Sequence, residues 1–344
     1  MKFLYDATAD EILEWVQAKN FPRYRATQIV GWLSKGICSF DQMVNLPVTI
    51  KNALAEDFYA DGVMILEKLE SAHDGTIKYV LQLKDDNIIE CVLMRYKHGN
   101  SICVSSQAGC KMKCSFCAST KAGFGRDLTA GEMLAQVLIV SDDIADRISN
   151  IVVMGIGEPF DNYDNLVLFI KAANNPEISG IGMRHIAIST CGLVDEMLKF
   201  SEEGFPVTLS ISLHAPNDEI RKQLMPIASR YSMEQLLDAC RTYIRKSGRR
   251  ITFEYILIAG VNDLPEHAIE LARKLRRIMC HVNLIPANEF EGCGYQKSSS
   301  RAVDTFKQIL LDAGINATVR RELGSDISAA CGQLRRTLIE GEQD

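Results

Sequence analysis

The sequence lacks any long apolar run. No stretch approaches the ~18 residues that a helix needs to span a bilayer, although hydrophobic residues make up 47% of the 344. Acidic side chains interrupt residues 1–16, where a secretion signal would keep an apolar core. We therefore expect a mature, cytoplasmic protein with no membrane partner.

The sequence also has no excess of positive charge. Its formal net charge is −6, which by itself does not indicate a nucleic-acid-binding protein, although phosphate contact requires only a local basic patch. Each local group of basic residues is, taken alone, more typical of a solvated surface. Charge therefore leaves the substrate undecided. The groups are Arg23 with Arg25, residues 245–250, and the pairs Arg276–Arg277, Arg320–Arg321 and Arg335–Arg336.

The chain contains no evident repeat or low-complexity tract, and its length is sufficient for about two domains. Apolar residues recur at helical spacing up to about residue 60, which predicts short helices. Residues 63–97 contain three apolar runs separated by turn residues, and Asp74-Gly75 indicates a β-hairpin.

From about residue 100 the pattern changes to strand, loop and helix, repeated. This alternation predicts parallel strands joined by right-handed crossovers, and six units predict a partial (β/α)6 barrel in an α/β protein. We expect helices over 130–144, 165–173, 233–246 and 266–278. The expected barrel strands are 102–106, 150–155, 185–190, 206–212, 251–257 and 281–286.

Four of the eleven cysteines lie between positions 103 and 117. Without a secretion signal, such cysteines favour metal ligation, thiol chemistry or burial over disulfides. Cys110, Cys114 and Cys117 have the spacing C-x3-C-x2-C directly after the first barrel strand. Three thiolates can hold an iron–sulfur cubane and leave its fourth iron open to a small molecule. The alternative is zinc or unligated thiols, but structural zinc normally takes a fourth protein ligand.

Polar residues follow several of the other strands, where barrel enzymes place their chemistry. Gly157 and Glu158 follow the second strand in the segment 154–159, MGIGEP. Ser189 ends the third strand, residues 212–214 end the fourth, and Asn288 follows the sixth. Together these groups could surround one polar ligand. His214 taken alone is equally well explained as a structural histidine.

These motifs together resemble the RlmN branch of the RlmN/Cfr radical-SAM methyltransferases, and the resemblance covers essentially the whole chain. It implies a radical-SAM barrel over residues 100–320, an N-terminal helical RNA-binding domain over 1–60, a hairpin region over 61–99, and a C-terminal segment over 321–344. The motifs that carry it are residues 103–117, MGIGEP (154–159), ISTCG (188–192), SISLHAPND (210–218), RxxLMPI (221–227), GVND (260–263), HVNLIPAN (281–288), GSDISAACGQL (324–334) and YRATQIVGWL (24–33).

The resemblance also implies a cofactor and its ligands. Cys110, Cys114 and Cys117 match the ligands of one [4Fe–4S] cluster. Two molecules of S-adenosylmethionine are then used per turnover. The residues that match the S-adenosylmethionine contacts are Gly157, Glu158, Ser189, Ser212, Leu213, His214 and Asn288.

Three further residues match catalytic positions of the family. Cys331 matches the cysteine that is methylated first and then hands on the carbon, and Cys103 matches the one that resolves the protein–RNA adduct through a transient disulfide. Glu90 matches the proposed general base. The substrate implied is C2 of adenosine in 23S rRNA, near the peptidyl-transferase region, and in tRNA beside the anticodon. A flavodoxin or ferredoxin would supply electrons, and the chain is expected to be a monomer.

Three alternatives remain open at this point. The nearest is methylation at C8, as in Cfr, because both reactions use the same catalytic residues. A radical enzyme acting on a small molecule or a protein is disfavoured by the N-terminal helices and by the pair Cys103 and Cys331. A non-catalytic, RNA-binding zinc protein is the third.

Two features fall outside the matched roles. The sequence offers no physical reason for Ser119-Thr120 where the family more often has threonine–glycine. The remaining cysteines are expected to be packing residues: Cys38, Cys91, Cys191, Cys240, Cys280 and Cys293.

Overall fold

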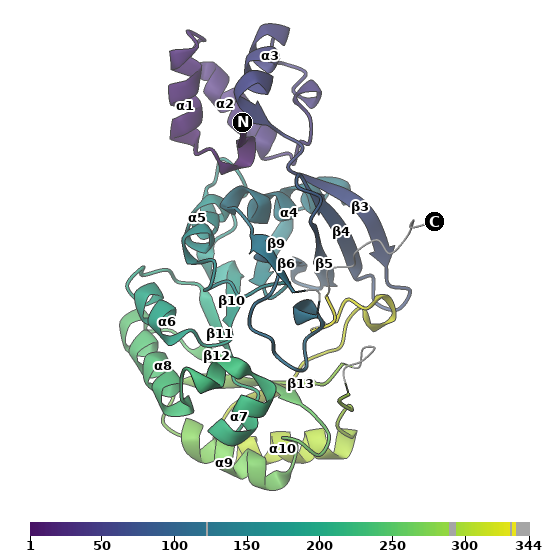
Figure 1. Cartoon of the computed structure of the whole chain (residues 1–344), viewed down its shortest axis with the longest axis vertical. Helices are drawn as coiled ribbons and strands as arrows, with labels where there is room; N and C mark the ends of the chain where they lie inside the picture. Colours follow the sequence, from purple (N-terminus) through teal and green to yellow (C-terminus); the bar gives the residue numbers. More distant parts are fainter. Residues whose placement is uncertain (122, 289–293, 331, 335–344) are drawn as a thin grey trace.

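The computed structural model describes residues 1–121, 123–288, 294–330 and 332–334. Its centre is a ten-stranded sheet with the order β14-β13-β12-β11-β10-β9-β6-β5-β4-β3 (Figure 1). The six predicted barrel strands are confirmed, and they run parallel to one another. They are β6 (Gly99–Val104), β9 (Ile148–Val153), β10 (Ile186–Thr190), β11 (Thr208–Ser212), β12 (Ile251–Leu257) and β13 (Cys280–Pro286).

Three short strands in the barrel region were not predicted from the sequence. β14 (Ala317–Val319) adds a seventh parallel strand beside β13. β7 (Gln107–Gly109) and β8 (Phe124–Asp127) pair antiparallel on either side of the cysteine loop. Strands of three or four residues are too short to show a periodic pattern.

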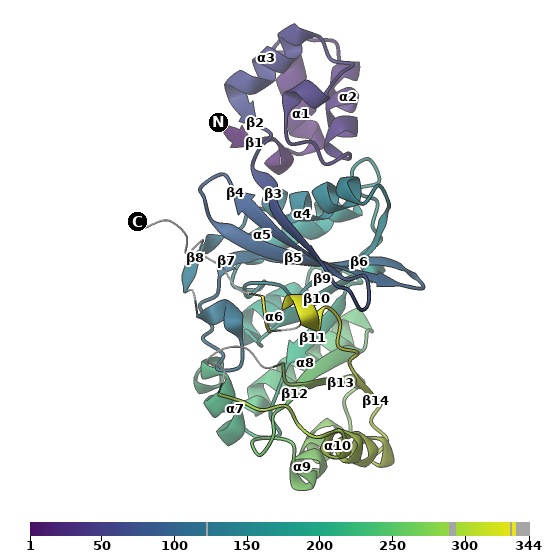
Figure 2. The ribbon, with the colours of Figure 1, turned by 90° about the vertical axis from the view of Figure 1, so that its right-hand side faces the viewer.

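The barrel helices lie along the outside of the sheet (Figures 1 and 2). Local sequence determines where several begin. Thr129 and Glu132 form a capping box at the start of α4, and Ser232 and Gln235 form one at the start of α8. The four predicted helices are confirmed. The barrel helices are α4 (Ala130–Asp143), α5 (Tyr163–Asn174), α6 (Val194–Phe200), α7 (Asp218–Leu224), α8 (Met233–Ser247), α9 (Pro265–Leu275) and α10 (Ser300–Asp312). No helix in the described ranges is both long enough and apolar enough to cross a membrane.

The N-terminal helices lie at the opposite end of the molecule from α9 and α10 (Figure 2). They are α1 (Ala9–Ala18), α2 (Tyr24–Leu33) and α3 (Val48–Asp57). The short strands β1 (Lys2–Phe3) and β2 (Phe58–Tyr59) pair in parallel and bring the two ends of this region together.

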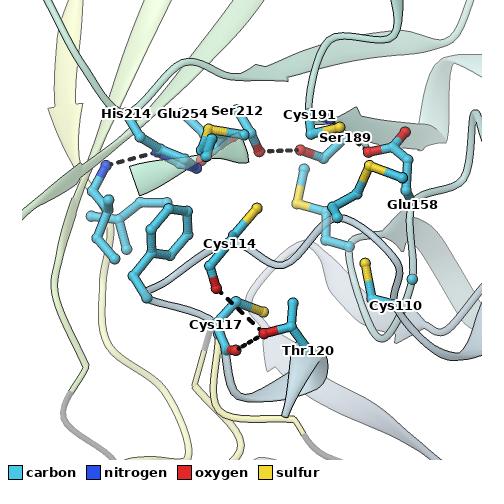
Figure 3. Close-up of a pocket in the computed structure, with 18 of the residues that line it drawn as sticks. Cys110, Cys114, Cys117, Thr120, Glu158, Ser189, Cys191, Ser212, His214 and Glu254 are labelled. Atoms are coloured by element: carbon cyan, nitrogen blue, oxygen red, sulfur yellow. Dashed lines mark hydrogen bonds between the residues drawn. The ribbon is translucent and has the colours of Figure 1, made fainter. Parts of the chain in front are cut away.

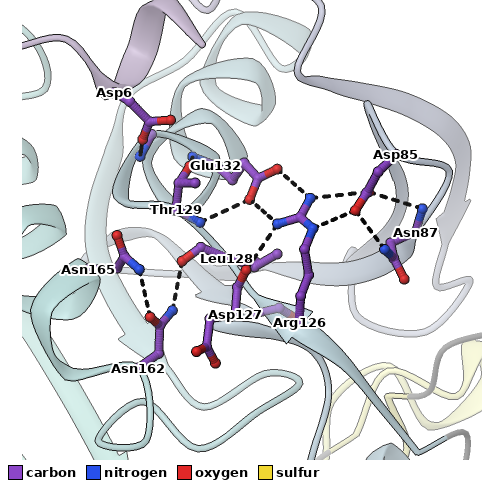
Figure 4. A network of polar contacts seen from close by, with 12 residues as sticks. Asp6, Asp85, Asn87, Arg126, Asp127, Leu128, Thr129, Glu132, Asn162 and Asn165 are labelled. Carbon is purple, nitrogen blue, oxygen red and sulfur yellow. Dashed lines mark hydrogen bonds and ion pairs between the residues drawn. The ribbon is translucent and has the colours of Figure 1, made fainter. Parts of the chain in front are cut away.

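Polar contacts attach this end of the chain to the start of α4 (Figure 4). The Gly131 amide donates to Asp6 Oδ1 at 2.7 Å. Arg126 donates to both oxygens of Glu132 at 2.7 Å and to Asp85. The guanidinium lowers the pKa of Asp85 to about 2. α4 therefore links the N-terminal helices, the sheet and the turn that holds Asp85.

Three antiparallel strands continue the barrel sheet beyond β6: β3 (Val63–Glu70), β4 (Ile77–Leu83) and β5 (Ile88–Tyr96). The register places Val92 opposite Cys103. Because side chains alternate along a strand, Glu90, Val92 and Cys103 project from the same face of the sheet. The residues expected to act as base and resolving thiol thus come from neighbouring strands.

Candidate active site

The three cysteines of the C-x3-C-x2-C motif line one pocket at the C-terminal ends of the barrel strands (Figure 3). Backbone contacts hold their loop in place. The Ser115 amide donates to the carbonyl of Leu224 at 3.0 Å, and Thr120 Oγ1 donates to the carbonyl of Cys117 at 2.9 Å. Burial raises the pKa of Cys110 to about 12, so metal binding at this loop must release protons.

Glu158 forms part of the opposite wall and is buried. Its Oε1 accepts a hydrogen bond from the Phe160 amide at 3.0 Å, and its Oε2 accepts one from the Cys191 amide at 2.7 Å. Burial raises the pKa of this carboxyl, while the backbone donors act in the opposite direction. The side chains of Thr190 and Cys191 also hydrogen-bond to this carboxylate, so it is held firmly in the pocket wall.

Gly157 precedes Glu158 and has a φ of +113°. A Cβ here would lie 2.7 Å from both Ser106 Oγ and Gln107 Cβ. The glycine is therefore required by the close passage of the chain past the segment that leads to the cysteine loop. Its position in the pocket wall follows from that packing.

Hydroxyl and imidazole groups complete this wall. Ser189 and Ser212 place their Oγ atoms 3.5 Å apart. His214 Nδ1 accepts a hydrogen bond from the Ile256 amide at 3.0 Å, and burial lowers the pKa of the imidazole to about 3. The neutral ring must then carry its hydrogen on Nε2, so His214 offers a donor to the pocket. The edge of the Phe116 ring packs against it, with centroids 4.8 Å apart.

Two of the seven expected S-adenosylmethionine contacts lie elsewhere. The side chain of Leu213 is fully buried in the core, and its backbone amide donates to the carbonyl of Glu254 at 3.0 Å. Asn288 lines a neighbouring pocket with Pro286 and Arg321. The structure thus brings Gly157, Glu158, Ser189, Ser212 and His214 together with the three cysteines.

Glu254, a buried carboxylate in the wall of the same pocket, was not among the residues predicted from the sequence. Its Oε2 accepts a hydrogen bond from Asn283 Nδ2 at 2.8 Å and lies 3.9 Å from Arg320 Nη1. Burial raises its pKa, and Arg320 opposes that rise. An acidic residue within the apolar strand ITFEYIL was a usable signal, because unpaired buried carboxylates are costly.

Cys103 lies in a second pocket that adjoins the first. The two pockets share part of their walls, including Cys117, Met154 and Gly155. Cys331 lies outside the described residues, but its neighbours Ala330 and Gly332 line the pocket that holds Cys103. The C-terminal segment therefore reaches the space between the cysteine loop and β6.

Ser119 now has a physical explanation. Its Oγ donates to the carbonyl of Leu334 at 2.6 Å, and the Ala118 amide donates to the carbonyl of Gly332 at 2.8 Å. The residues that follow Cys117 thus hold the segment that flanks Cys331.

Glu90 is only 1% exposed and forms an ion pair with Lys78, Nζ to Oε1 3.3 Å. Glu90 lies two residues before Val92 on β5. Val92 lines the pocket of Cys103, whereas Glu90 is not among the described residues of that pocket wall. A buried carboxylate is expected to have such a partner.

The other cysteines differ in their surroundings. Cys91, Cys240 and Cys280 are buried in the core, as expected for packing residues, and Cys38 is half-buried. Cys191 also packs in the core, but it lines the pocket of the cysteine loop. Cys103 is buried, and Cys293 lies outside the described residues.

Comparisons with known proteins identify this arrangement. The sequence pattern of the radical SAM superfamily matches residues 104–275. The structure resembles the crystal structure of a radical SAM methyltransferase from Sphaerobacter thermophilus, with a TM-score of 0.94 and 43% identity over 98% of this chain and 100% of that one. The fold and the site define a radical SAM enzyme.

Further matches specify the family. Residues 3–59 match the N-terminal domain of ribosomal RNA large subunit methyltransferases. The probable dual-specificity RNA methyltransferase RlmN of Clostridium novyi is 50% identical over 340 residues, which are 98% of this chain and 99% of that protein. Its namesake from Thermoanaerobacter sp. (strain X514) is 51% identical over 338 residues, 98% of each chain. The chain belongs to the RlmN family of radical SAM RNA methyltransferases.

Proposed function

We propose that this chain methylates C2 of adenosine in 23S rRNA and in tRNA beside the anticodon. One observation carries the proposal: the pocket of the three cysteines adjoins the pocket that holds Cys103 and the neighbours of Cys331. An enzyme that activates S-adenosylmethionine at a cluster and transfers carbon through a second thiol requires these two sites side by side.

The donor set fits a [4Fe–4S] cluster. Cys110, Cys114 and Cys117 line one pocket, yet among the described residues no three Cys, His, Asp or Glu side chains are close enough to hold a single ion. A cubane accepts its thiolates on separate irons, so ligands that share a pocket without converging on one point suit it. When bound, the cluster supplies the electron that cleaves S-adenosylmethionine.

The opposite wall provides groups for S-adenosylmethionine itself. The buried carboxylate of Glu158 can attract an ammonium. Ser189 and Ser212 can bond to a carboxylate or to hydroxyls, and His214 can donate from Nε2. Glu254 adds a second buried carboxylate. We propose that Leu213 and Asn288 contribute from the margin of this wall. We also propose that one molecule of S-adenosylmethionine methylates Cys331 and that a second one serves to activate that methyl group.

The second pocket suits the later steps. Cys103 can attack the sulfur of Cys331 to release the methylated base, which leaves a disulfide that must be reduced again. The ion pair with Lys78 stabilises the carboxylate of Glu90, the form that a general base requires. We further propose a monomer in the cytoplasm that receives electrons from a flavodoxin or ferredoxin.

Anaerobic reconstitution followed by mass spectrometry of digested RNA tests this function. We expect a brown protein that produces 5′-deoxyadenosine and 2-methyladenosine. Cys114→Ala should lower both products at least 100-fold, because a cluster ligand is lost, whereas Cys240→Ala should leave them within twofold, because that thiol is buried in the core away from the pocket.

The other outcomes separate the alternatives. An 8-methyladenosine product would establish the Cfr-type reaction instead. Tight binding of zinc, with no iron taken up by the three thiols, would leave the radical reaction without a source of electrons and would sink the proposal.

A further inference from the structure

Arg221, in the middle of α7, is a buried arginine that forms no ion pair with any described residue. Its side chain is 0% exposed. Nη2 donates to the carbonyl of Cys191 at 2.7 Å, but Nε and Nη1 are buried and have no hydrogen-bond partner among the described residues. Leaving a guanidinium in this state costs several kcal/mol of folding free energy, of the order of ~3–5. Such a residue is expected to have a counter-ion in the functional protein.

The helix that carries Arg221 is attached to the cysteine loop. The carbonyl of Leu224, at the end of α7, accepts from the Ser115 amide at 3.0 Å and from Ser115 Oγ at 3.3 Å. Arg221 itself donates to the carbonyl of Cys191, and Cys191 lines the same pocket as Cys114. The guanidinium is therefore held directly behind the wall of the pocket that the cysteine loop forms.

The acidic residues nearby do not neutralise it. Asp218 lies one turn earlier in α7 and its charge acts on Arg221 from a distance, but its Oδ1 accepts the Met233 amide at 2.7 Å, and no nitrogen of the guanidinium bonds to it in the described structure. Both oxygens of Glu158 accept backbone amides instead. The negative charge that is missing is the charge that three thiolates and a cluster would bring.

We propose that Arg221 is the counter-ion of the iron–sulfur cluster and that it favours the reduced form. This inference rests on the proposed function, because it requires the cluster. The cluster and its three thiolates carry net negative charge, which increases when an electron arrives from the flavodoxin- or ferredoxin-type donor, itself oxidised in the exchange. A fixed positive charge in a poorly solvated site stabilises the more negative state.

The pocket geometry indicates that Arg221 acts on the cluster through its charge and does not touch it. Arg221 does not belong to the wall of the cysteine pocket, whereas Cys114 and Cys191 do. It is thus a positioning residue, which acts on the cluster through the field and through the loop that it supports. S-adenosylmethionine in that pocket would not touch it.

The test compares Arg221→Met, which removes the charge at similar volume, with Arg221→Lys, which keeps the charge. Arg249→Met is the matched control. Arg249 also donates to a backbone carbonyl, that of Val207 at 3.0 Å, but this contact lies at the N-terminal end of β11, away from the pocket at the C-terminal ends of the strands. Each reconstituted protein is titrated against redox dyes, and the reduced cluster is measured by electron paramagnetic resonance.

We expect Arg221→Met to lower the ratio of reduced to oxidised cluster at least tenfold at a fixed potential, which is about 59 mV for a one-electron couple. Arg221→Lys should recover most of this shift, and Arg249→Met should show none. If Arg221→Met holds its cluster at the wild-type potential, the proposal is wrong and the arginine is only a packing residue.

A second measurement covers the case in which Arg221→Met retains no cluster. Without iron, that variant should unfold at a temperature equal to or above that of the wild type, because an uncompensated buried charge has been removed. A lower unfolding temperature would show a structural role and overturn the inference. Failure of the wild type to hold iron would instead contradict the proposed function, so the two failures are distinguishable.

Discussion

The hydrogen-bonding state of His214 is determined by the protein itself. Its Nδ1 accepts the Ile256 amide, and its backbone has a φ of +57°, which is uncommon for a residue with a side chain. The backbone thus selects the tautomer before any ligand arrives. A site prepared in this way can bind without first reorganising its own donor.

This environment predicts a pH dependence of stability. Burial, assisted by the charge of Arg221, lowers the pKa of His214 from 6.5 to about 3. Below pH 6.5 the unfolded chain binds a proton that the folded protein excludes, so stability should be lost as the pH falls from 6.5 towards 3. The slope is ~1.4 kcal/mol per pH unit.

His214→Gln provides the comparison, because its amide oxygen can still accept the Ile256 amide. Urea unfolding of the cluster-free proteins at pH 7.5 and 5.0 should show that the wild type loses ~2 kcal/mol more than the variant. Equal losses would mean that His214 is protonated in the folded state.

At the scale of elements, the C-terminal segment is held at both ends of its described part. The turn between β3 and β4 holds its start: Ser71 Oγ donates to Asp326 Oδ1 at 2.8 Å, and the Ala72 amide donates to Asp326 Oδ2 at 3.0 Å. Ser119 and Ala118 hold its end. The antiparallel strands therefore position the segment that flanks Cys331 as well as Glu90.

Asp326→Ala should release this segment without unfolding the barrel. Both hydrogen bonds to the hairpin turn are lost, so backbone amides between 324 and 334 should exchange with deuterium at least tenfold faster, and RNA methylation should fall. Asp312→Ala is the control, because Asp312 makes a comparable contact, with Gln308, on the exposed face of α10. Unchanged exchange in the Asp326 variant would show that the contacts of Asp326 with the hairpin turn do not hold the segment.

At the scale of the whole molecule, the N-terminal region packs closely against α4. A Cβ on Gly131 would lie 2.6 Å from Asp6 Oδ1 and 2.7 Å from the Asp6 backbone nitrogen. Alanine is normally the better helix former, so glycine at this position is explained by the approach of residues 5 and 6 to α4.

Two identical substitutions should therefore have opposite effects. Gly131→Ala should lower the free energy of unfolding by ~1–3 kcal/mol, because the chain at Asp6 must move away. Gly31→Ala, in α2 with open space around its Cβ position, should raise it by ~0.5–1 kcal/mol. Thermal unfolding of both variants checks this, and stabilisation by Gly131→Ala would show that the contact at Asp6 is not tight.

Features that depend on neighbouring residues in the chain could be predicted from the sequence. The six barrel strands, the long helices and the cysteine loop all follow from local periodicity, capping residues or spacing. Glu254 was marked by its place in an apolar strand, and Arg221 lies in a motif, but neither could be given a role because their roles depend on burial and on partners distant in the sequence. The same holds for Asn288, whose side chain lines a different pocket from that of the cysteines.

The sequence by itself determined the α/β class, the order of the elements and the family, because each of these is encoded in short segments that can be read one at a time. Only the tertiary structure decided which polar groups share the pocket, that Cys103 adjoins the C-terminal segment, and that Arg221 is buried with no ion pair to a described residue. These features arise where strands, loops and the chain's end meet, and such long-range contacts leave no periodic pattern in the sequence.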